Sequence, residues 1–182
     1  VNGAGGVALG DLNGDGTVEV CVSGASTSVV CVNGVDGSFY WAGGTEVNRY
    51  GCPAIADLDA DGLAEVIFGR TVLNSDGTKR FQGTGGIGGS TVMSFAVDWD
   101  MDGLLEVVAG NTIYREDGTI LWNDEYTDAA PAIGDFDLDG RPDLVRAGNG
   151  QVMVTMNDGA LLWSTATTGG GSAGAPTVAD FD

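Results

Sequence analysis

An acidic nine-residue segment occurs four times in the chain, with oxygen-bearing side chains at positions 1, 3, 5 and 9 and glycine at position 6. Such side chains, together with the backbone carbonyl of position 7, suit a hard cation that takes about six to eight oxygen ligands. One copy could arise by chance, but four copies in register predict four calcium sites. The predicted ligands are Asp11, Asn13, Asp15, Thr17 and Glu19 in loop 1; Asp57, Asp59, Asp61, Leu63 and Glu65 in loop 2; Asp98, Asp100, Asp102, Leu104 and Glu106 in loop 3; and Asp135, Asp137, Asp139, Arg141 and Asp143 in loop 4.

The net charge of −19 argues against nucleic acid or an anionic membrane surface as a partner. Most of the 26 acidic residues lie in the four loops, where they alternate with apolar residues. A disordered acidic tail or a merely solvated surface would scatter its acids or run them together. The charge therefore supports the prediction of metal loops.

Several kinds of protein are disfavoured by what the sequence lacks. It contains no histidine, which is the commonest general base and a usual ligand of zinc. No apolar stretch approaches the roughly 18 residues of a membrane-spanning helix, so no membrane insertion is expected. Without an initiator methionine or a signal peptide, the chain is expected to be a mature or excised piece of a longer one.

The loops belong to a longer repeat. Their first aspartates recur about every 40 residues, and a further start occurs at Asp180 and Asp182. Each repeat also carries an Asp-Gly pair, which between apolar runs favours a hairpin. In the fourth repeat these signals predict strands at 131–134, 143–147, 152–155 and 160–163. Four antiparallel strands at this period predict an all-β fold of β-propeller blades.

The predicted blades span about 1–50, 51–90, 91–128 and 129–174, and the first strand of a fifth falls within 175–182. The glycine-rich segments 83–90 and 165–174 are interpreted as links between blades, because neither opens a helix nor carries the lysine of a phosphate-binding loop. Four blades and one extra strand favour a piece of a larger ring, a partial or open propeller. An assembly completed by another chain is the second interpretation.

An aromatic residue follows the aspartate of each Asp-Gly pair by five positions. These residues are Trp41, Phe81, Trp122 and Trp163. A sugar-stacking platform is one reading of the series, but recurrence at one blade position favours packing between neighbouring blades. Position 2 of each loop is likewise expected to face the core. The residues there are Leu12, Leu58, Trp99, Phe136 and Phe181.

The three cysteines leave two alternatives open. Cys21 and Cys31 lie symmetrically about a turn near Ser26, so they are expected to face each other on adjacent strands. In an oxidising compartment they could form a cross-strand disulfide, with Cys52 left over. The other alternative is three buried thiols.

Each loop is followed at once by a strand-like run such as Val66–Phe68, whereas helix–loop–helix calcium hands place their last acid at position 12 and continue into a helix. Over residues 5–182 the chain resembles the FG-GAP/VCBS repeat family, the calcium-loop propellers typified by the head of integrin alpha subunits. The resemblance implies side-chain ligands at positions 1, 3, 5 and 9 and a carbonyl ligand at position 7. Asn13 departs from the family's aspartate, and the fifth loop is incomplete.

The leading functional hypothesis is a calcium-binding, non-enzymatic propeller of a secreted or surface protein, used for adhesion or ligand recognition. Its expected partners are protein or carbohydrate ligands at the cell surface or matrix. A second hypothesis is a structural segment of an extracellular filament or surface assembly, made with further copies of the chain or the rest of a larger propeller. A third is a non-catalytic propeller attached to a polysaccharide-active enzyme.

Overall fold

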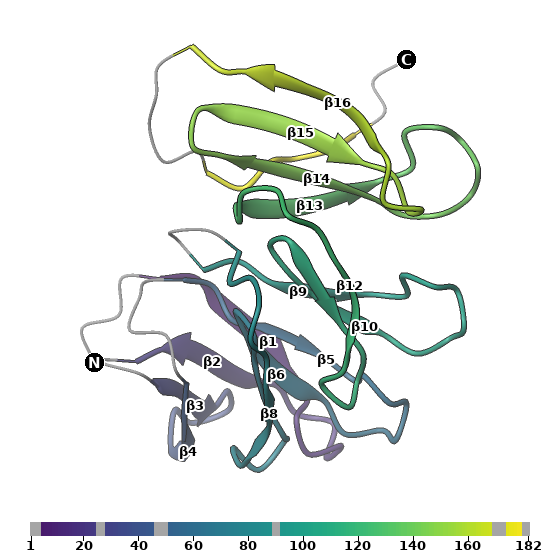
Figure 1. Ribbon diagram of the computed structural model, residues 1–182. Coiled ribbons are helices and arrows are strands. Elements are labelled where there is room, and N and C mark those ends of the chain that lie inside the picture. The colour runs from purple at the N-terminus through teal and green to yellow at the C-terminus, as the bar shows by residue number, and fades with distance from the viewer. Residues whose placement is uncertain (1–4, 25–27, 46–50, 89–91, 169–173, 180–182) are drawn as a thin grey trace.

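The computed structural model describes residues 5–24, 28–45, 51–88, 92–168 and 174–179. This part of the chain contains no helix and folds into four antiparallel four-stranded sheets (Figure 1), which confirms the predicted all-β fold. None of the described residues forms a helix that could cross a membrane. In every sheet the strands are paired in chain order, so each sheet is one propeller blade.

The blades repeat the same four strands. Blade 1 consists of β1 (Val7–Gly10), β2 (Glu19–Ser23), β3 (Ser28–Asn33) and β4 (Phe39–Gly44). Blade 2 consists of β5 (Ala54–Ala56), β6 (Glu65–Phe68), β7 (Thr71–Leu73) and β8 (Lys79–Gln82). Blade 3 consists of β9 (Phe95–Val97), β10 (Glu106–Ala109), β11 (Thr112–Tyr114) and β12 (Ile120–Asn123). Blade 4 consists of β13 (Ala130–Gly134), β14 (Asp143–Gly148), β15 (Gln151–Thr155) and β16 (Leu161–Ala166).

The predicted strands of blade 4 match the observed ones to within a few residues. The largest difference is in β16, which continues to Ala166 and so takes in the first two residues of the expected link 165–174. The expected fifth strand overlaps the described segment 174–179, which is not a strand. Asp180, Phe181 and Asp182, the expected start of a fifth loop, lie outside the described residues.

Each blade folds locally around its two turns. The acidic loop joins the first strand to the second, and the Asp-Gly pair joins the third to the fourth. In the second turn the aspartate accepts a hydrogen bond from the backbone N–H two residues later, at 2.9 Å between Asp76 Oδ1 and Thr78 N, and the following Gly77 has φ +81°. A positive φ is easy only for glycine, so the turn depends on that residue.

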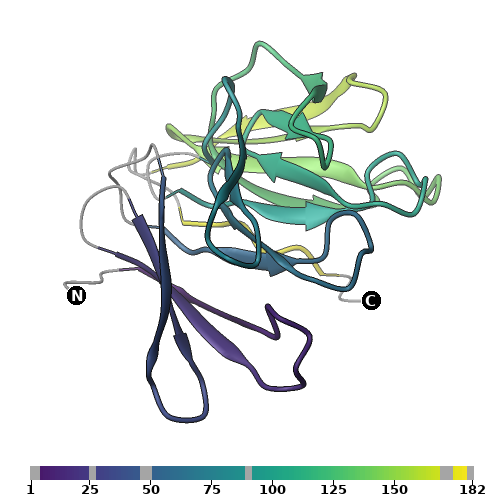
Figure 2. The same cartoon turned by 90° about the horizontal axis from the view of Figure 1, so that it is seen from below.

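The blades are stacked face to face in chain order and do not close on one another (Figures 1 and 2). The face of a blade that lies toward the preceding blade is called its leading face, and the face toward the following blade its trailing face. Three apolar clusters fill the spaces between consecutive blades. Between blades 1 and 2, for example, Leu12 and Trp41 pack with Val66, Phe68 and Leu73.

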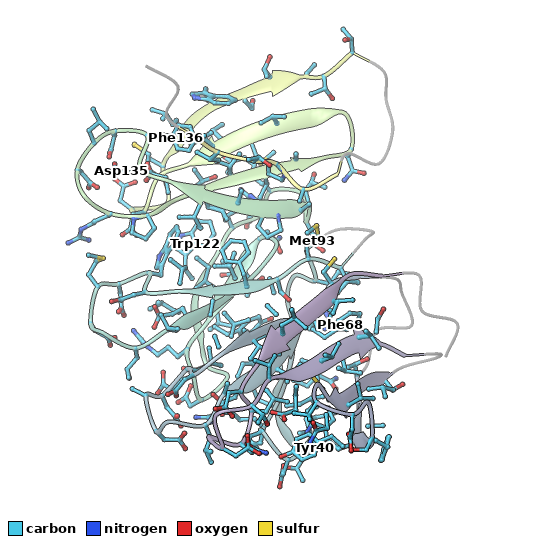
Figure 3. All side chains as sticks on the ribbon, turned by 180° about the vertical axis from the view of Figure 1, so that it is seen from behind. Tyr40, Phe68, Met93, Trp122, Asp135 and Phe136 are labelled. Carbon is cyan, nitrogen blue, oxygen red and sulfur yellow. A yellow bond between two sulfur atoms is a disulfide. The ribbon has the colours of Figure 1, made fainter. Side chains whose placement is uncertain are left out.

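The aromatic residues of the fourth strands pack as predicted in the first three blades. Trp41 lies against Gly77, Phe81 against Gly118 and Trp122 against Gly159, each glycine being in the turn of the following blade. Figure 3 shows Trp122 between blades 3 and 4.

Blade 4 departs from this expectation. Trp163 is 41% exposed, and at loop position 2 Phe136 is 36% exposed although Leu12, Leu58 and Trp99 are at most 3% exposed. Figure 3 places Phe136 on the other side of blade 4 from Trp122. The prediction of a buried residue at these two positions is wrong here, because no described sheet covers the trailing face of blade 4.

The cysteines adopt the first of the two alternatives. Cys21 on β2 lies opposite Cys31 on β3, and the two form a disulfide within the core between blades 1 and 2. Cys52 is free and half-buried.

The packing of the turn glycines gives a stability prediction. An alanine Cβ at Gly77 would lie 2.6 Å from Cδ2 of Trp41, whereas at Gly37, with a similar φ of +72°, it would meet nothing within 4 Å. We expect Gly77→Ala to lower the free energy of unfolding by about 1–3 kcal/mol more than Gly37→Ala, because only the first adds a clash to the backbone strain. Chemical denaturation of both variants at low protein concentration measures the difference, and equal losses would contradict the packing.

Candidate metal centre

The first aspartate of every loop holds the loop's backbone in place. One of its carboxylate oxygens accepts a hydrogen bond from the N–H of position 5 and the other from the N–H of position 6. In loop 2 these bonds join Asp61 N to Asp57 Oδ1 at 3.1 Å and Gly62 N to Asp57 Oδ2 at 2.9 Å. The same pair of bonds recurs in loops 1, 3 and 4. The loop is therefore wound tightly around one carboxylate.

Two residues of each loop adopt left-handed backbone conformations. Position 6 is glycine in all four loops, with φ between +84° at Gly16 and +95° at Gly103. Position 4 also has positive φ, and only loop 1 has glycine there. The residues in the other loops are Ala60, Met101 and Leu138, with φ of +58°, +64° and +61°. Because such a conformation costs an L-residue about 1–2 kcal/mol, three of the loops are strained at this position.

The acid at position 9 begins the second strand and is almost fully buried. Glu19, Glu65, Glu106 and Asp143 are 1–3% exposed. In each loop one carboxylate oxygen of this acid accepts a hydrogen bond from the N–H of position 2, at 2.7 Å between Glu106 Oε2 and Trp99 N. Burial raises the pKa of Glu65 and of Glu106 above its usual value, and the nearby aspartates raise it further.

The acid at position 3 leaves one oxygen without a partner in loops 2 and 3. Asp59 Oδ2 is paired with the guanidinium of Arg80 at 2.6 Å, and Asp100 Oδ2 with that of Arg115 at 3.3 Å. The hydrogen bond and charge of Arg80 lower the pKa of Asp59. In both aspartates Oδ1 is buried and accepts no hydrogen bond. A buried anionic oxygen without a partner is costly unless a cation or a donor meets it.

Three of the loops bring ligand atoms from three acids within 4.8 Å of one another. The groups are Asp57, Asp59 and Asp61; Asp98, Asp100 and Glu106; and Asp135, Asp137 and Asp143. In loop 1 the amide of Asn13 takes the place of one acid and donates a hydrogen bond to Asp15 Oδ2 at 3.1 Å. At position 7, Thr17, Leu63, Leu104 and Arg141 offer their backbone carbonyls, since the side chains of Leu63, Leu104 and Arg141 carry no acceptor.

Loop 4 differs from the others in its last acid. Both oxygens of Asp143 accept backbone hydrogen bonds, from Phe136 N at 2.8 Å and from Asn157 N at 3.0 Å. In loops 1 to 3 the glutamate at position 9 accepts its hydrogen bond from the backbone N–H of position 2 through Oε2. The other oxygen of Glu65, Oε1, is paired with the guanidinium of Arg80.

Across the four loops the potential ligands are oxygen atoms with a high density of negative charge. The unpartnered oxygens of Asp59 and Asp100 are among them. This donor chemistry fits a hard divalent cation.

Sequence reasoning missed two arginines that join neighbouring blades, one of which also pairs with the acids of a loop. Arg80 pairs with Asp59 and Glu65, and its Nε donates to the carbonyl of Glu116 in the turn of blade 3 at 2.9 Å. It thus joins loop 2 to the following blade. Arg146 on β14, fully buried, forms a bidentate pair with Asp124 of blade 3. The chain has seven lysines and arginines and 26 acidic residues, so each basic residue could have been predicted to pair with an acid. The sequence does not show which acid each one pairs with.

Comparison with known families and structures agrees with this fold. Residues 2–68 match the sequence profile described as FG-GAP-like repeat, which confirms the predicted resemblance. Among curated proteins none matches the chain.

Solved structures show a similar fold at low sequence identity. The biofilm matrix protein Bap1 of V. cholerae is 24% identical with a TM-score of 0.76, over 92% of this chain and 30% of its own. A rhamnogalacturonan lyase of Bacillus licheniformis is 17% identical with a TM-score of 0.61, over 87% of this chain and 30% of its own. BamB of Moraxella catarrhalis is 15% identical with a TM-score of 0.58, over 89% of this chain and 52% of its own. The chain thus spans about a third to a half of these structures, and the likeness shows the propeller fold.

The bridge made by Arg80 can be tested without metal. We expect Arg80→Met to lower the free energy of unfolding by about 1–2 kcal/mol in EGTA, because Asp59 and the buried Glu65 lose their counter-charge. Lys79→Met is the matched control, since the neighbouring Lys79 is exposed and bonds only to Gln82 Oε1 among the described contacts. Urea denaturation of the two variants measures the effect, and a loss no larger in Arg80→Met than in the control would contradict it.

Proposed function

We propose that this chain is a calcium-stabilised propeller module of an extracellular or cell-surface protein, used for adhesion or ligand recognition and not for catalysis. The observation that carries the calcium part of the proposal is the pair of buried, unpartnered oxygens on Asp59 and Asp100 within clusters of acids. A cation bound in each of these two loops would satisfy its unpartnered oxygen and relieve the repulsion among the neighbouring carboxylates.

Calcium suits these loops better than the other common divalent ions. Magnesium requires near-ideal octahedral geometry and retains several waters, whereas calcium accepts six to eight oxygens in irregular arrangements. Zinc prefers nitrogen and sulfur ligands, and the chain has no histidine. A nine-residue loop offering four side-chain oxygens and one carbonyl therefore favours calcium, with about four sites in the chain.

An extracellular site of action is supported by two further observations. The Cys21–Cys31 disulfide is a type of bond that persists in oxidising compartments. The structural neighbours include a biofilm matrix protein and rhamnogalacturonan lyases, which are proteins of matrix or polysaccharide chemistry by their own names. We infer from this that the partner is a matrix or cell-surface protein or carbohydrate.

A non-catalytic role is supported by the chemistry of the acids. The carboxylates of the loops are occupied by backbone hydrogen bonds, arginines and the proposed ion, which makes them poor general acids or bases.

Calcium removal should reduce stability strongly. At about tenfold excess over its dissociation constant, calcium adds roughly 1.4 kcal/mol per site, so four sites would add on the order of 6 kcal/mol. We expect EGTA to lower the melting temperature by roughly 10–20 °C, as measured by differential scanning calorimetry. An unchanged melt would contradict structural calcium.

A single loop can be tested separately. Asp59→Asn removes the charge of an acid whose Oδ1 is unpartnered, so we expect calorimetric titration to show one calcium site weakened at least about tenfold. Asp76→Asn is the matched control, because Asp76 lies in the second turn of the same blade and outside every loop. Equal calcium binding by the two variants would argue against loop 2 as a site.

Recognition and catalysis can be distinguished with polysaccharides and matrix proteins. We expect calcium-dependent retention of the chain on at least one immobilised matrix polysaccharide or protein, and no release of reducing or unsaturated sugars from pectic polysaccharides. Surface plasmon resonance and an ultraviolet lyase assay measure the two properties. Product formation at catalytic rates would overturn the non-enzymatic proposal.

A further inference from the structure

One arginine is paired with two of the acids of loop 2. The guanidinium of Arg80 lies 2.6 Å from Asp59 Oδ2 and 3.1 Å from Glu65 Oε1. The side chain of Glu65 is only 3% exposed, and that of Arg80 is 22% exposed. Both acids are expected calcium ligands, at positions 3 and 9 of the loop. Arg80 thus already supplies a positive charge to oxygens that a calcium ion would use.

Both oxygens of Glu65 are occupied as a result. Oε2 accepts a hydrogen bond from Leu58 N at 3.0 Å, and Oε1 is paired with Arg80. In loop 2 the acids whose ligand atoms lie within 4.8 Å of one another are those of positions 1, 3 and 5. In loops 3 and 4 the position-9 acid is one of the three converging acids. Glu65 therefore pairs with Arg80 instead of converging with the other acids of its loop.

The other blades have no basic residue at the place of Arg80. This residue directly precedes the aromatic residue of the fourth strand. The corresponding residues of blades 1, 3 and 4 are Tyr40, Leu121 and Leu162. Arg115, which follows the third strand of blade 3, pairs with Asp100 and with no position-9 acid among the described ion pairs. The double pairing is thus a feature of loop 2 and not of the repeat.

Contact with the next blade accounts for only one of the three guanidinium nitrogens of Arg80. Its Nε donates to the carbonyl of Glu116 at 2.9 Å. At the preceding interface the indole N–H of Trp41 donates to the equivalent carbonyl, that of Ser75, at 2.8 Å. The side chain of Phe81 has no N–H, so Arg80 supplies this bond between blades 2 and 3. The bond does not explain why both terminal nitrogens point into loop 2.

A calcium ion in loop 2 would lie close to the same guanidinium. Calcium binds oxygens at about 2.3–2.6 Å, so an ion held by Asp59 would lie within about 8 Å of Arg80. Two positive charges at this distance repel each other, and Arg80 also keeps Glu65 from the ion. Arg80 therefore stabilises the loop without calcium and lowers the affinity of the loop for calcium.

We propose that Arg80 is an internal counter-ion of loop 2, which holds the loop together without calcium and which calcium displaces from Glu65 when it binds. The ion would take Glu65 Oε1 and the unpartnered Asp59 Oδ1, while Arg80 keeps Asp59 Oδ2 and the carbonyl of Glu116. Loop 2 is then a weaker site than it would be without Arg80. The proposal rests on the proposed calcium binding and names the residue that sets the affinity of one site.

The test is calorimetric calcium titration of the full chain and of Arg80→Met, whose side chain is apolar like those of Leu121 and Leu162 at the same place. We expect one site of Arg80→Met to bind calcium at least about tenfold more tightly, because the ion no longer meets a positive charge and gains Glu65. Lys79→Met is the matched control, since it removes an equal charge from the neighbouring position, and Lys79 bonds to Gln82 rather than to loop 2 among the described contacts.

A second substitution assigns the effect to loop 2. Asp61 is an expected ligand at position 5, and its carboxylate accepts a hydrogen bond from Leu63 N rather than from Arg80. In an Asp61→Asn background, where loop 2 is weakened, Arg80→Met should tighten none of the three other sites. Arg80→Gln is uncharged but can still donate to the carbonyl of Glu116, so it replaces Arg80→Met if that variant does not fold without calcium.

Each outcome decides the proposal. A single tightened site, seen only when Arg80 is replaced and loop 2 is intact, would support it. Unchanged or weaker binding by Arg80→Met and Arg80→Gln, or an equal gain in Lys79→Met, would overturn it and leave the proposed calcium sites in place. Tightening of the other three sites in the Asp61→Asn background would also overturn it. An unaltered chain that binds no calcium would refute both the proposed calcium sites and this role of Arg80.

Discussion

Each blade depends on holding several carboxylates together at one turn. The first aspartate of a loop is surrounded by backbone N–H groups, and the last acid is buried at the start of the second strand. These hydrogen bonds compensate part of the charge, and Arg80 and Arg115 compensate more in loops 2 and 3. Asp59 Oδ1 and Asp100 Oδ1 remain uncompensated. Backbone strain at position 4 of three loops also lowers the stability of the folded state. A cation bound in the loop would offset these unfavourable terms and stabilise the hairpin that the loop joins.

The loops also connect one blade to the next. The residue at position 2 of each loop donates its backbone N–H to the carboxylate of the last acid of the same loop. In blades 1 to 3 its side chain packs between blades together with the aromatic residue of the fourth strand. Arg80 extends this connection through the carbonyl of Glu116 in blade 3. We therefore expect a change in the charge of a loop, or a bound ion, to affect the stability of the neighbouring interface between blades.

Local patterns in the sequence were enough to predict the strands, the two turns of each blade and the convergence of the acids, because these features arise within about 40 residues. They also predicted that Cys21 and Cys31 face each other. Contacts between blades were predicted only where they repeat, as at Trp41, Phe81 and Trp122. The exposure of Phe136 and Trp163 was not predicted, since the repeat pattern does not show that no described sheet covers this face of blade 4. The pair of Arg146 with Asp124 was missed because it occurs once, so no repeated pattern marks it.

The proposal that the four acidic loops hold calcium ions underlies the expected stability and recognition of the chain. It is tested most directly by a crystal structure determined in calcium-containing buffer, with anomalous diffraction data collected to locate the ions. We expect an anomalous peak in each of the four loops, coordinated by the oxygens of positions 1, 3, 5 and 9 and by the carbonyl of position 7. Loops without peaks, with Asp59 and Asp100 hydrogen-bonded to water or to other side chains instead, would contradict it.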